Sequence, residues 1–255
     1  KMAIKIKKID EKNKVSRYLV KGTTPALLNA IRRSVMLHVP CLAIDEVKIY
    51  ENNSVMFDEF LAHRLGMLPL QTDSKGYKTG EKVKLVLEKE GSCMVYSKDI
   101  KSTDPKIEVI DKKIPIVKLG KDQKLKAEMQ AVMQAGKEHS KWQPAIVAYQ
   151  ELPVVYSEKE CNQCGQCIEA CPKSVLEIQG KKVVLKDAME CILCGACRDA
   201  CERDALTVDA EKGSYILHIE PIAGMSENDI IGNAVQELQE KAKDFGKLLS
   251  KVKGG

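Results

Sequence analysis

The feature that most constrains the fold of this chain is a repeat that places eight cysteines between residues 161 and 201. Residues 161–171 read CNQCGQCIEAC, and residues 191–201 read CILCGACRDAC, 30 residues further on. The chain has ten cysteines and no signal-peptide pattern near its start, so we expect a cytoplasmic protein, whose thiols stay reduced. Disulfides are therefore not expected, and the spacing indicates metal ligation.

Both halves separate their cysteines by two, two and three residues, which is the pattern of ferredoxins that hold two clusters. In this pattern a tight loop wraps three thiolates around one cubane cluster. The fourth cysteine lies on the next helical turn and reaches the neighbouring cluster. We therefore predict two [4Fe–4S] clusters. The ligands of the first are Cys161, Cys164, Cys167 and Cys201, and those of the second are Cys191, Cys194, Cys197 and Cys171.

Two four-cysteine zinc sites are the main alternative, but zinc sites usually space their ligands as separated C-x2-C pairs. Pro172 follows the first run, whereas Glu202 stands at the equivalent position of the second, which leaves the loop there open. Paired clusters relay electrons, stabilise a fold or act as a redox-sensitive latch, and the cysteines do not choose among these roles. Because exposed clusters are labile to oxygen, we expect an aerobic sample to lose them or to contain [3Fe–4S] forms.

Outside the repeat, the sequence predicts an α+β body. Thr24 and Pro25 have the residue types of an N-cap and a first helical position, and Pro40 ends the apolar periodicity that follows. A short helix is expected near residues 58–66. Strands are expected at residues 4–6, 15–20, 44–49, 82–87, 114–119, 145–149, 154–156 and 215–219, the last bounded by Gly213-Ser214 and Pro221.

The C-terminal segment predicts a long helix that starts at Ser226, with Asp229 three residues further on. Its apolar residues recur at alternating intervals of four and three, which is the seam of a coiled coil. Such a seam packs either on the chain's own sheet or against a helix of a partner, and the pattern alone leaves both open. The seam consists of Ile231, Val235, Leu238, Ala242, Phe245, Leu249 and Val252.

The sequence contains no motif of an enzyme active site. It has no HExxH, P-loop, GxSxG or GxGxxG pattern, and no apolar run of the ~20 residues that a transmembrane helix needs. The net charge is +5, but no basic cluster is interleaved with the few aromatic residues, so sequence-specific nucleic-acid binding is not expected. The alternative of an electron carrier with a docking body stays open at this point.

Three long segments outside the cysteines carry a resemblance to a known family. They read TPALLNAIRRSVMLHVPCLAIDEVKIYENNS at residues 24–54, DEFLAHRLGMLPL at residues 58–70 and EHSKWQP at residues 138–144. Together with the closing strand and helix, they resemble the D subunits of archaeal RNA polymerase, relatives of the bacterial alpha subunit. Some of these subunits carry an inserted ferredoxin-like domain, and the repeat stands at the corresponding place.

The resemblance implies three domains. A discontinuous, alpha-subunit-like dimerisation domain would comprise residues 1–48, 143–156 and 210–255. An inserted α+β domain would comprise residues 49–142, and a ferredoxin-like domain with two [4Fe–4S] clusters would comprise residues 157–209.

The resemblance also implies that the chain is a non-catalytic assembly subunit in transcription. It would pair with polymerase subunit L and form the platform for the large catalytic subunits and the small subunits N and P. The active site would lie in a large subunit, and the clusters would stabilise or gate the platform. The residues implied at the dimer seam are Leu27, Ile31, Val35, Ile231, Val235, Leu238, Ala242, Phe245 and Leu249. The residues implied at the platform are Arg32, Arg33, Asp58, Glu59, His63 and Arg64.

Overall fold

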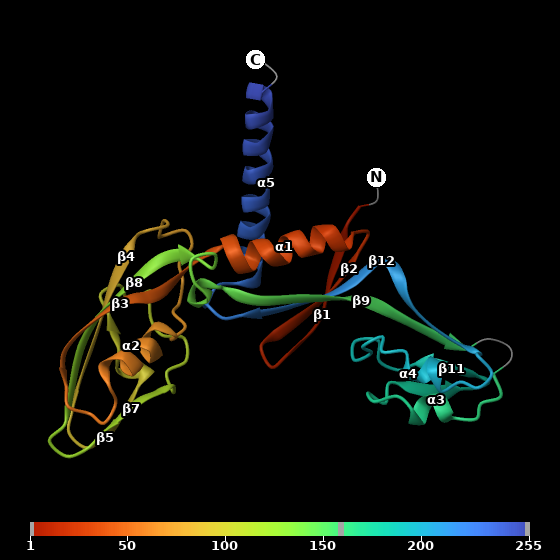
Figure 1. Ribbon diagram of the computed structural model, residues 1–255, viewed down its shortest axis with the longest axis horizontal. Helices are drawn as coiled ribbons and strands as arrows, with labels where there is room; N and C mark the ends of the chain where they lie inside the picture. Colours follow the sequence, from red (N-terminus) through yellow and green to blue (C-terminus); the bar gives the residue numbers. More distant parts are fainter. Residues whose placement is uncertain (1–2, 158–160, 253–255) are drawn as a thin grey trace. The chain divides into compact units, whose positions relative to one another are not determined.

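The computed structural model describes residues 3–157 and 161–252 of the chain (Figure 1). Its contacts divide the chain into two compact units. The first unit comprises Lys1–Leu28 and Ala148–His218, and the second comprises Asn29–Val147 and Ile219–Gly255. The chain therefore passes between the units three times. The three-domain division expected from the sequence stays a prediction, because two compact units alone do not locate its boundaries.

The first unit contains a six-stranded sheet in the order β1-β2-β12-β9-β11-β10. β1 and β2 form an antiparallel hairpin, with a register shift between Lys8 and Asp10. β10 and β11 form a second hairpin, and Val184 of β11 pairs with Tyr156 of β9. The strands are β1 (Lys5–Lys12), β2 (Val15–Lys21), β9 (Ala145–Ser157), β10 (Leu176–Gln179), β11 (Lys182–Leu185) and β12 (Leu206–Pro221).

The second unit contains a four-stranded sheet in the order β3-β8-β4-β6 and a two-stranded sheet of β5 and β7. The four-stranded sheet is antiparallel, and β3 pairs with β8 over most of its length. The strands are β3 (Pro40–Asn52), β4 (Lys82–Glu90), β5 (Cys93–Tyr96), β6 (Lys101–Ser102), β7 (Pro115–Leu119) and β8 (Lys124–Ala135).

Alternation of apolar and polar residues explains why these segments form strands with one buried face. In β8, Leu125, Ala127 and Met129 are buried while the residues between them are partly exposed, and β4 repeats this with Val83, Leu85 and Leu87 against exposed lysines. The buried face joins helix α2 (Asp58–Gly66) in one apolar core. The helix expected near residues 58–66 is thus confirmed.

Two further helices lie outside the cysteine repeat, α1 (Pro25–His38) and α5 (Glu227–Val252). Both begin as predicted. The hydroxyl of Thr24 accepts the N–H of Leu27 over 3.3 Å, and that of Ser226 accepts the N–H of Asp229 over 3.1 Å. In the described parts of the chain, no helix is both long and apolar enough to cross a membrane.

Two strands are longer than the sequence predicts. β9 is continuous from Ala145 to Ser157 although it contains Pro153, where we expected two separate pieces. β12 begins at Leu206, so Gly213 lies inside the strand and does not mark its beginning. Gly213 has a φ of 73°, which glycine adopts without strain, and its carbonyl oxygen accepts the N–H groups of Gly22 and Thr23.

Candidate iron–sulfur centre

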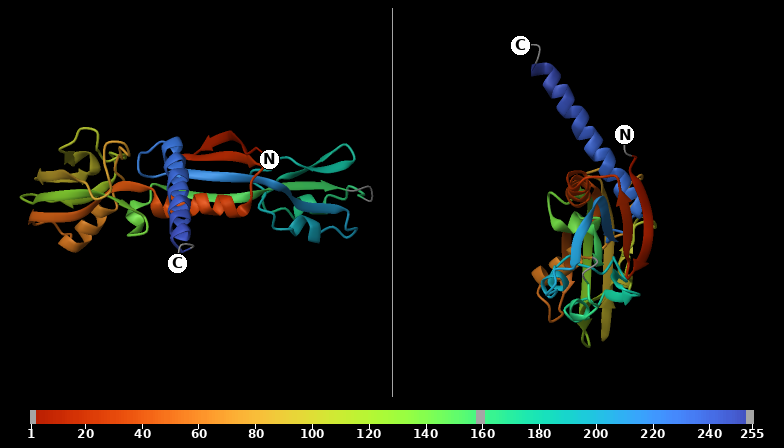
Figure 2. Two further views of the ribbon diagram at one scale, coloured as in Figure 1. Left: turned by 90° about the horizontal axis from the view of Figure 1, so that it is seen from above. Right: turned by 90° about the vertical axis from the view of Figure 1, so that its right-hand side faces the viewer.

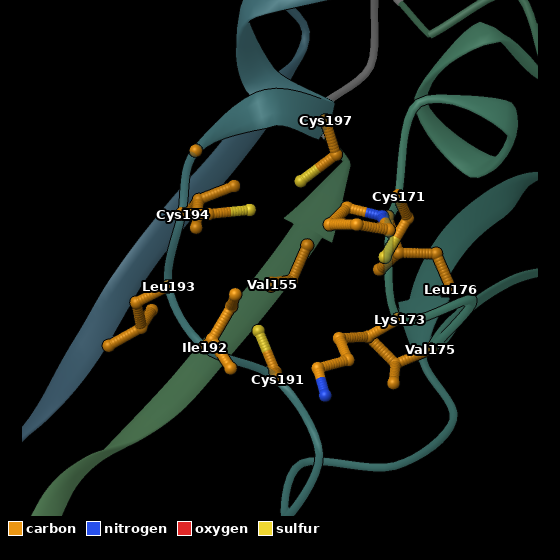
Figure 3. A pocket seen from close by; sticks show the side chains of 13 residues that line it. Val155, Cys171, Lys173, Val175, Leu176, Cys191, Ile192, Leu193, Cys194 and Cys197 are labelled. Atoms are coloured by element: carbon orange, nitrogen blue, oxygen red, sulfur yellow. The ribbon is translucent and has the colours of Figure 1, made fainter.

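The eight repeat cysteines line two separate cavities in the first unit. We call them the first-cluster cavity, lined by Cys161, Cys164, Cys167 and Cys201, and the second-cluster cavity, lined by Cys171, Cys191, Cys194 and Cys197. Figure 3 shows the second-cluster cavity, with the four cysteine sulfur atoms directed toward one central space. Each cavity therefore groups three cysteines of one repeat with the fourth cysteine of the other, which is the grouping that the spacing predicts.

The backbone of the two loops shows why three cysteines surround each cavity. Gln163 and Leu193 have positive φ values of 62° and 53°, and Gly165 and Gly195 have values of 86° and 78°. These left-handed residues turn the chain sharply on both sides of Cys164 and of Cys194. A short helix follows each turn, α3 (Gln166–Glu169) or α4 (Ala196–Asp199). The two halves thus share one conformation, 30 residues apart.

A third left-handed residue stands three positions after the fourth cysteine of each repeat. Ser174 follows Cys171 with a φ of 51°, and Asp204 follows Cys201 with a φ of 49°. The N–H of Ala205 donates to the sulfur of Cys201 over 3.3 Å. A backbone donor next to a thiolate ligand stabilises its negative charge, so this contact suits cluster ligation.

Burial differs among the cysteines. The third cysteine of each repeat, Cys167 or Cys197, is only 8% exposed, whereas the second, Cys164 or Cys194, is exposed. Burial raises the pKa of the Cys167 and Cys197 thiols above the ordinary cysteine value. Because thiolates bind iron, the positive charge of the metal has to offset this cost, and metal binding is accordingly coupled to proton release.

The cavities suit a cluster better than a single ion. Among the described residues, no group of three or more His, Cys, Asp or Glu side chains converges as one metal ion requires. A cubane spreads its thiolates around a larger body, and in each cavity four cysteines from the two repeats surround one shared space. Apolar side chains such as Val155, Val175 and Leu206 complete the lining. A [4Fe–4S] cluster held here would supply one-electron redox chemistry and a rigid cross-link between the loops.

The cysteines are also the centre of the module's core. Its buried residues are few, and the partly buried ones around them include three more cysteines. Such a core is small for a fold of about fifty residues, and small folds of this kind usually gain stability from bound metal or disulfides. The buried set is Val155, Cys167, Leu176, Val183, Cys197 and Leu206.

The predicted dimer seam lies mostly on an exposed helix. α5 leaves the rest of the second unit after its first turns (Figures 1 and 2), and every residue from position 239 to 252 is exposed. Phe245 is 64% exposed and Leu249 is 48% exposed. The chain's own contacts use Ile230 and Ala234 instead, which are fully buried and lie beside the seam. The sequence pattern did not single out these two residues.

The seam residues of α1 are divided. Leu27 is 40% exposed and Ile31 is partly buried, but Val35 is fully buried within the chain. A partner helix cannot reach the Val35 side chain in this conformation, because the second unit's own packing covers it. Val35 therefore does not belong to a partner surface in this structure.

The predicted platform residues are also divided. All of them are exposed except Arg32, which is partly buried and binds the side-chain oxygen of Asn29 over 3.0 Å. Asp58 accepts the amide of Asn52 over 2.7 Å, and Arg64 donates to the carbonyl oxygen of Ile116 over 3.1 Å. Arg32, Asp58 and Arg64 thus make contacts within the unit, and Asp58 and Arg64 make theirs at its surface.

Sequence reasoning missed an apolar group beside these charges. Four large side chains on and around α2 are at least half exposed, which is unusual for so small an area. The sequence already contained a sign of this group, since Phe57 and Phe60 stand on either side of the charged residues Asp58 and Glu59. They are Val55, Phe57, Phe60 and Met67.

Comparisons with known proteins identify the family. Residues 47–154 match the RNA polymerase Rpb3/RpoA insert domain, and residues 147–206 match the 4Fe-4S dicluster domain. The DNA-directed RNA polymerase subunit Rpo3 of Methanothermobacter thermautotrophicus is 40% identical over 241 residues, which cover 89% of this chain and 91% of that protein. This chain belongs to the Rpo3 family. The Rpo3 subunits of Archaeoglobus fulgidus and Pyrococcus furiosus are 36% and 31% identical, and each match covers 98% of this chain and at least 98% of the relative.

The family assignment confirms the resemblance to archaeal D subunits and the mixed fold class with an insert domain and a ferredoxin-like domain. It also favours iron–sulfur ligation over zinc, because the cysteine repeat lies within a 4Fe-4S dicluster match. The matched ranges overlap at residues 147–154, so they do not fix the boundaries predicted from the sequence.

Proposed function

We propose that this Rpo3-family chain is a non-catalytic assembly subunit of DNA-directed RNA polymerase that pairs with small subunit L through α5. The observation that carries the proposal is the exposed apolar seam on the second half of that helix. The relatives match this chain over nearly their whole length, and they are named as polymerase subunits. The alternative of an electron carrier has no comparable support.

The seam requires a partner for energetic reasons. Every residue in the second half of α5 is exposed, so this half is not packed on the described parts of the chain. An isolated helix of about this length is only marginally stable in water. Covering the exposed part of a seam side chain such as Phe245 or Leu249 contributes at most ~1.5–3 kcal/mol each. A partner helix that buries the seam therefore stabilises both the pair and α5 itself. The family resemblance assigns Leu27 and Ile31 of α1 to the same pairing.

The platform for the large subunits and for subunits N and P would include the α2 region. Here the exposed charges of Arg33, Glu59 and His63 occur in the same unit as the exposed apolar side chains of Phe57 and Phe60. Buried apolar anchors with a polar rim are the usual composition of a specific interface. In this proposal the nucleotidyl-transfer site belongs to a large subunit, and this chain supplies surfaces only.

We assign two [4Fe–4S] clusters to this chain, with the ligand sets of the two cavities. Their role in this proposal is to stabilise the cysteine module, by which we mean the ferredoxin-like part expected at residues 157–209. Its small core supports the assignment, because metal binding energy then becomes folding energy. Loss of either cluster would loosen this part of the platform, which gives the cell's redox and iron status a route to polymerase assembly.

An oxygen-free pull-down of the tagged chain from its own cells tests the proposal. We expect the large polymerase subunits and one small alpha-like subunit at equal stoichiometry. Cys164→Ser and Cys194→Ser should keep the small partner but recover less of the large subunits. Recovery of redox enzymes without polymerase would overturn the assembly role, and unchanged recovery from the cysteine variants would overturn only the role of the clusters.

A further inference from the structure

Arg17 connects the β1–β2 hairpin to the loop that carries the second cluster's ligands. Its guanidinium donates to both carboxylate oxygens of Asp10 in the same hairpin and, from the third nitrogen, to Glu190 over 3.0 Å. Glu190 directly precedes Cys191, the first cysteine of the second-cluster cavity. One side chain thus joins two segments that are 173 residues apart.

This contact is well placed to transmit a change. The Arg17 side chain is only 14% exposed, although both of its carboxylate partners reach solvent. The hydrogen bonds that Arg17 donates to Asp10 raise the pKa of Arg17, so the arginine stays charged. A planar guanidinium bound on two edges has a fixed orientation, and a shift of either partner must move it or break a hydrogen bond.

A second hydrogen bond reinforces the link. The side-chain amide of Gln150, on β9, donates to the carbonyl oxygen of Met189 over 3.3 Å. Residues 189 and 190 are therefore held from two different strands of the first unit.

A groove of about 420 Å³ lies along this junction and adjoins the second-cluster cavity. Arg17, Glu190 and His218 line the groove, and Lys173 and Ile192 line both the groove and the cavity. The residues that line the first-cluster cavity, as far as the structure describes them, do not occur in the groove. The hairpin is thus a neighbour of the second cluster and not of the first.

We propose that the second cluster, through Glu190 and Arg17, fixes the β1–β2 hairpin, so that loss of this cluster loosens the hairpin while loss of the first does not. The inference rests on the two-cluster assignment proposed above. Iron bound by Cys191, Cys194 and Cys197 restricts the loop in which Glu190 stands. The hairpin then gains a rigid anchor, and by reciprocity an intact Arg17 helps the loop to keep its cluster.

The coupling is tested with chains that can complete only one ligand set. After anaerobic reconstitution, Cys164→Ser keeps the second set and Cys194→Ser keeps the first. We expect hydrogen exchange of residues 5–21 to be faster in Cys194→Ser than in wild type, and unchanged in Cys164→Ser. Equal exchange in the two variants, whether raised or not, overturns the proposal, because the hairpin then does not distinguish the clusters.

The reverse direction is measured in the Cys164→Ser background as the rate at which a chelator bleaches the remaining cluster. Arg17→Gln should accelerate bleaching roughly two- to tenfold, the range expected for a partly buried ion pair. Arg17→Lys keeps the positive charge but loses the planar guanidinium, so its bleaching rate should lie between those of the Cys164→Ser background alone and Arg17→Gln. Glu211→Gln is the matched control, since it breaks the 2.8 Å pair with Lys21 in the same hairpin without touching the cluster loop. Equal acceleration by Glu211→Gln would overturn the role of Arg17.

Arg17→Gln could also disturb the hairpin through Asp10, so Glu190→Gln provides the second arm. If Arg17 acts through Glu190, the bleaching rate of the double variant equals that of the faster single variant. Multiplied effects in the double variant would contradict a shared route. Polymerase recovery enters neither measurement, so failure of the assembly proposal and failure of this one are distinguishable.

Discussion

The buried hydroxyl of Ser34 on α1 donates a hydrogen bond to the carbonyl oxygen of Ala234 on α5, over 2.9 Å. Ser34 is 1% exposed and Ala234 is fully buried. Small side chains allow the two helix backbones to approach closely enough for this bond. The contact anchors the first turns of α5 to the second unit and leaves the rest of the helix free for a partner.

Replacing Ser34 with Ala should lower the free energy of unfolding by about 1 kcal/mol, since a buried hydrogen bond is lost and a small cavity remains. Ser250→Ala is the control. Its hydroxyl also donates to a helix carbonyl, that of Lys247 over 2.8 Å, but both groups are exposed. We expect the control to stay within about 0.5 kcal/mol of wild type. Urea unfolding of the isolated chain measures both. An equal loss in the two variants would mean that the α1–α5 contact adds nothing.

Phe245→Glu should abolish pairing with the small polymerase subunit and leave the isolated chain as stable as before. The reason is that Phe245 is 64% exposed in the chain alone, so its loss is felt only in the complex. Lys251→Gln changes the net charge by the same amount and lies about 120° from Phe245 around the helix, at 100° per residue. Co-purification and thermal unfolding check the two variants. Loss of pairing in Lys251→Gln as well would point to charge and not to the seam.

The features of α5 that depend on residues close in sequence could be predicted, and those that depend on distant residues could not. Ser226 caps the helix through a bond to Asp229, three residues away, so the start of the helix could be predicted. Ile230 and Ala234 are buried against elements that are distant in sequence, and no local pattern distinguishes them from the neighbouring seam residues Ile231 and Val235. The side of the helix that packs on the chain itself was therefore not predictable.

The cysteine module shows the same division. Spacing within 41 residues predicted which cysteines share a cavity, because the loop and the following helical turn determine where each thiol points. The contact of Arg17 with Glu190 joins positions that only the completed six-stranded sheet brings together. Both are ordinary charged residues in the sequence, and neither position carries a motif.

Stability of the second unit should decrease as the pH falls below about 6.5, in part through His38 on α1. Burial lowers the pKa of His38 below its ordinary value of 6.5, and the charge of Lys241 on α5 lowers it further. The unfolded chain therefore binds a proton at a higher pH than the folded chain does. The stabilising contribution is complete above the unfolded pKa and is lost as the pH falls. NMR titration of His38 should give a pKa below 6.5 that rises in Lys241→Gln. A value above 6.5 in wild type would contradict this.

Removing iron from the anaerobic protein with a chelator should unfold the cysteine module and leave the second unit folded. The two cores are separate, and of these two only the one around Cys167 and Cys197 contains sulfurs of the proposed ligands. Hydrogen exchange of residues 161–206 should therefore rise toward that of an unfolded chain, while β3, β4 and β8 stay protected. If the module keeps its protection without iron, its apolar side chains suffice and the stabilising role of the clusters fails.

Gly136→Ala should be strongly destabilising for a steric reason. A Cβ atom built on Gly136 lies 2.0 Å from the carbonyl oxygen of Met36, a backbone atom that cannot turn away as a side chain can. The end of α1 or the segment after β8 has to shift, and overpacking of this kind costs ~1–3 kcal/mol or more. Gly232→Ala is the opposite case, because a Cβ there meets nothing within 4 Å and the residue lies inside α5. Alanine in a helix interior is favoured over glycine by ~0.5–1 kcal/mol, so this variant should be stabilised. Opposite shifts of the urea midpoint for one and the same substitution would establish that contact with Met36, and not the loss of glycine flexibility, decides the outcome at Gly136.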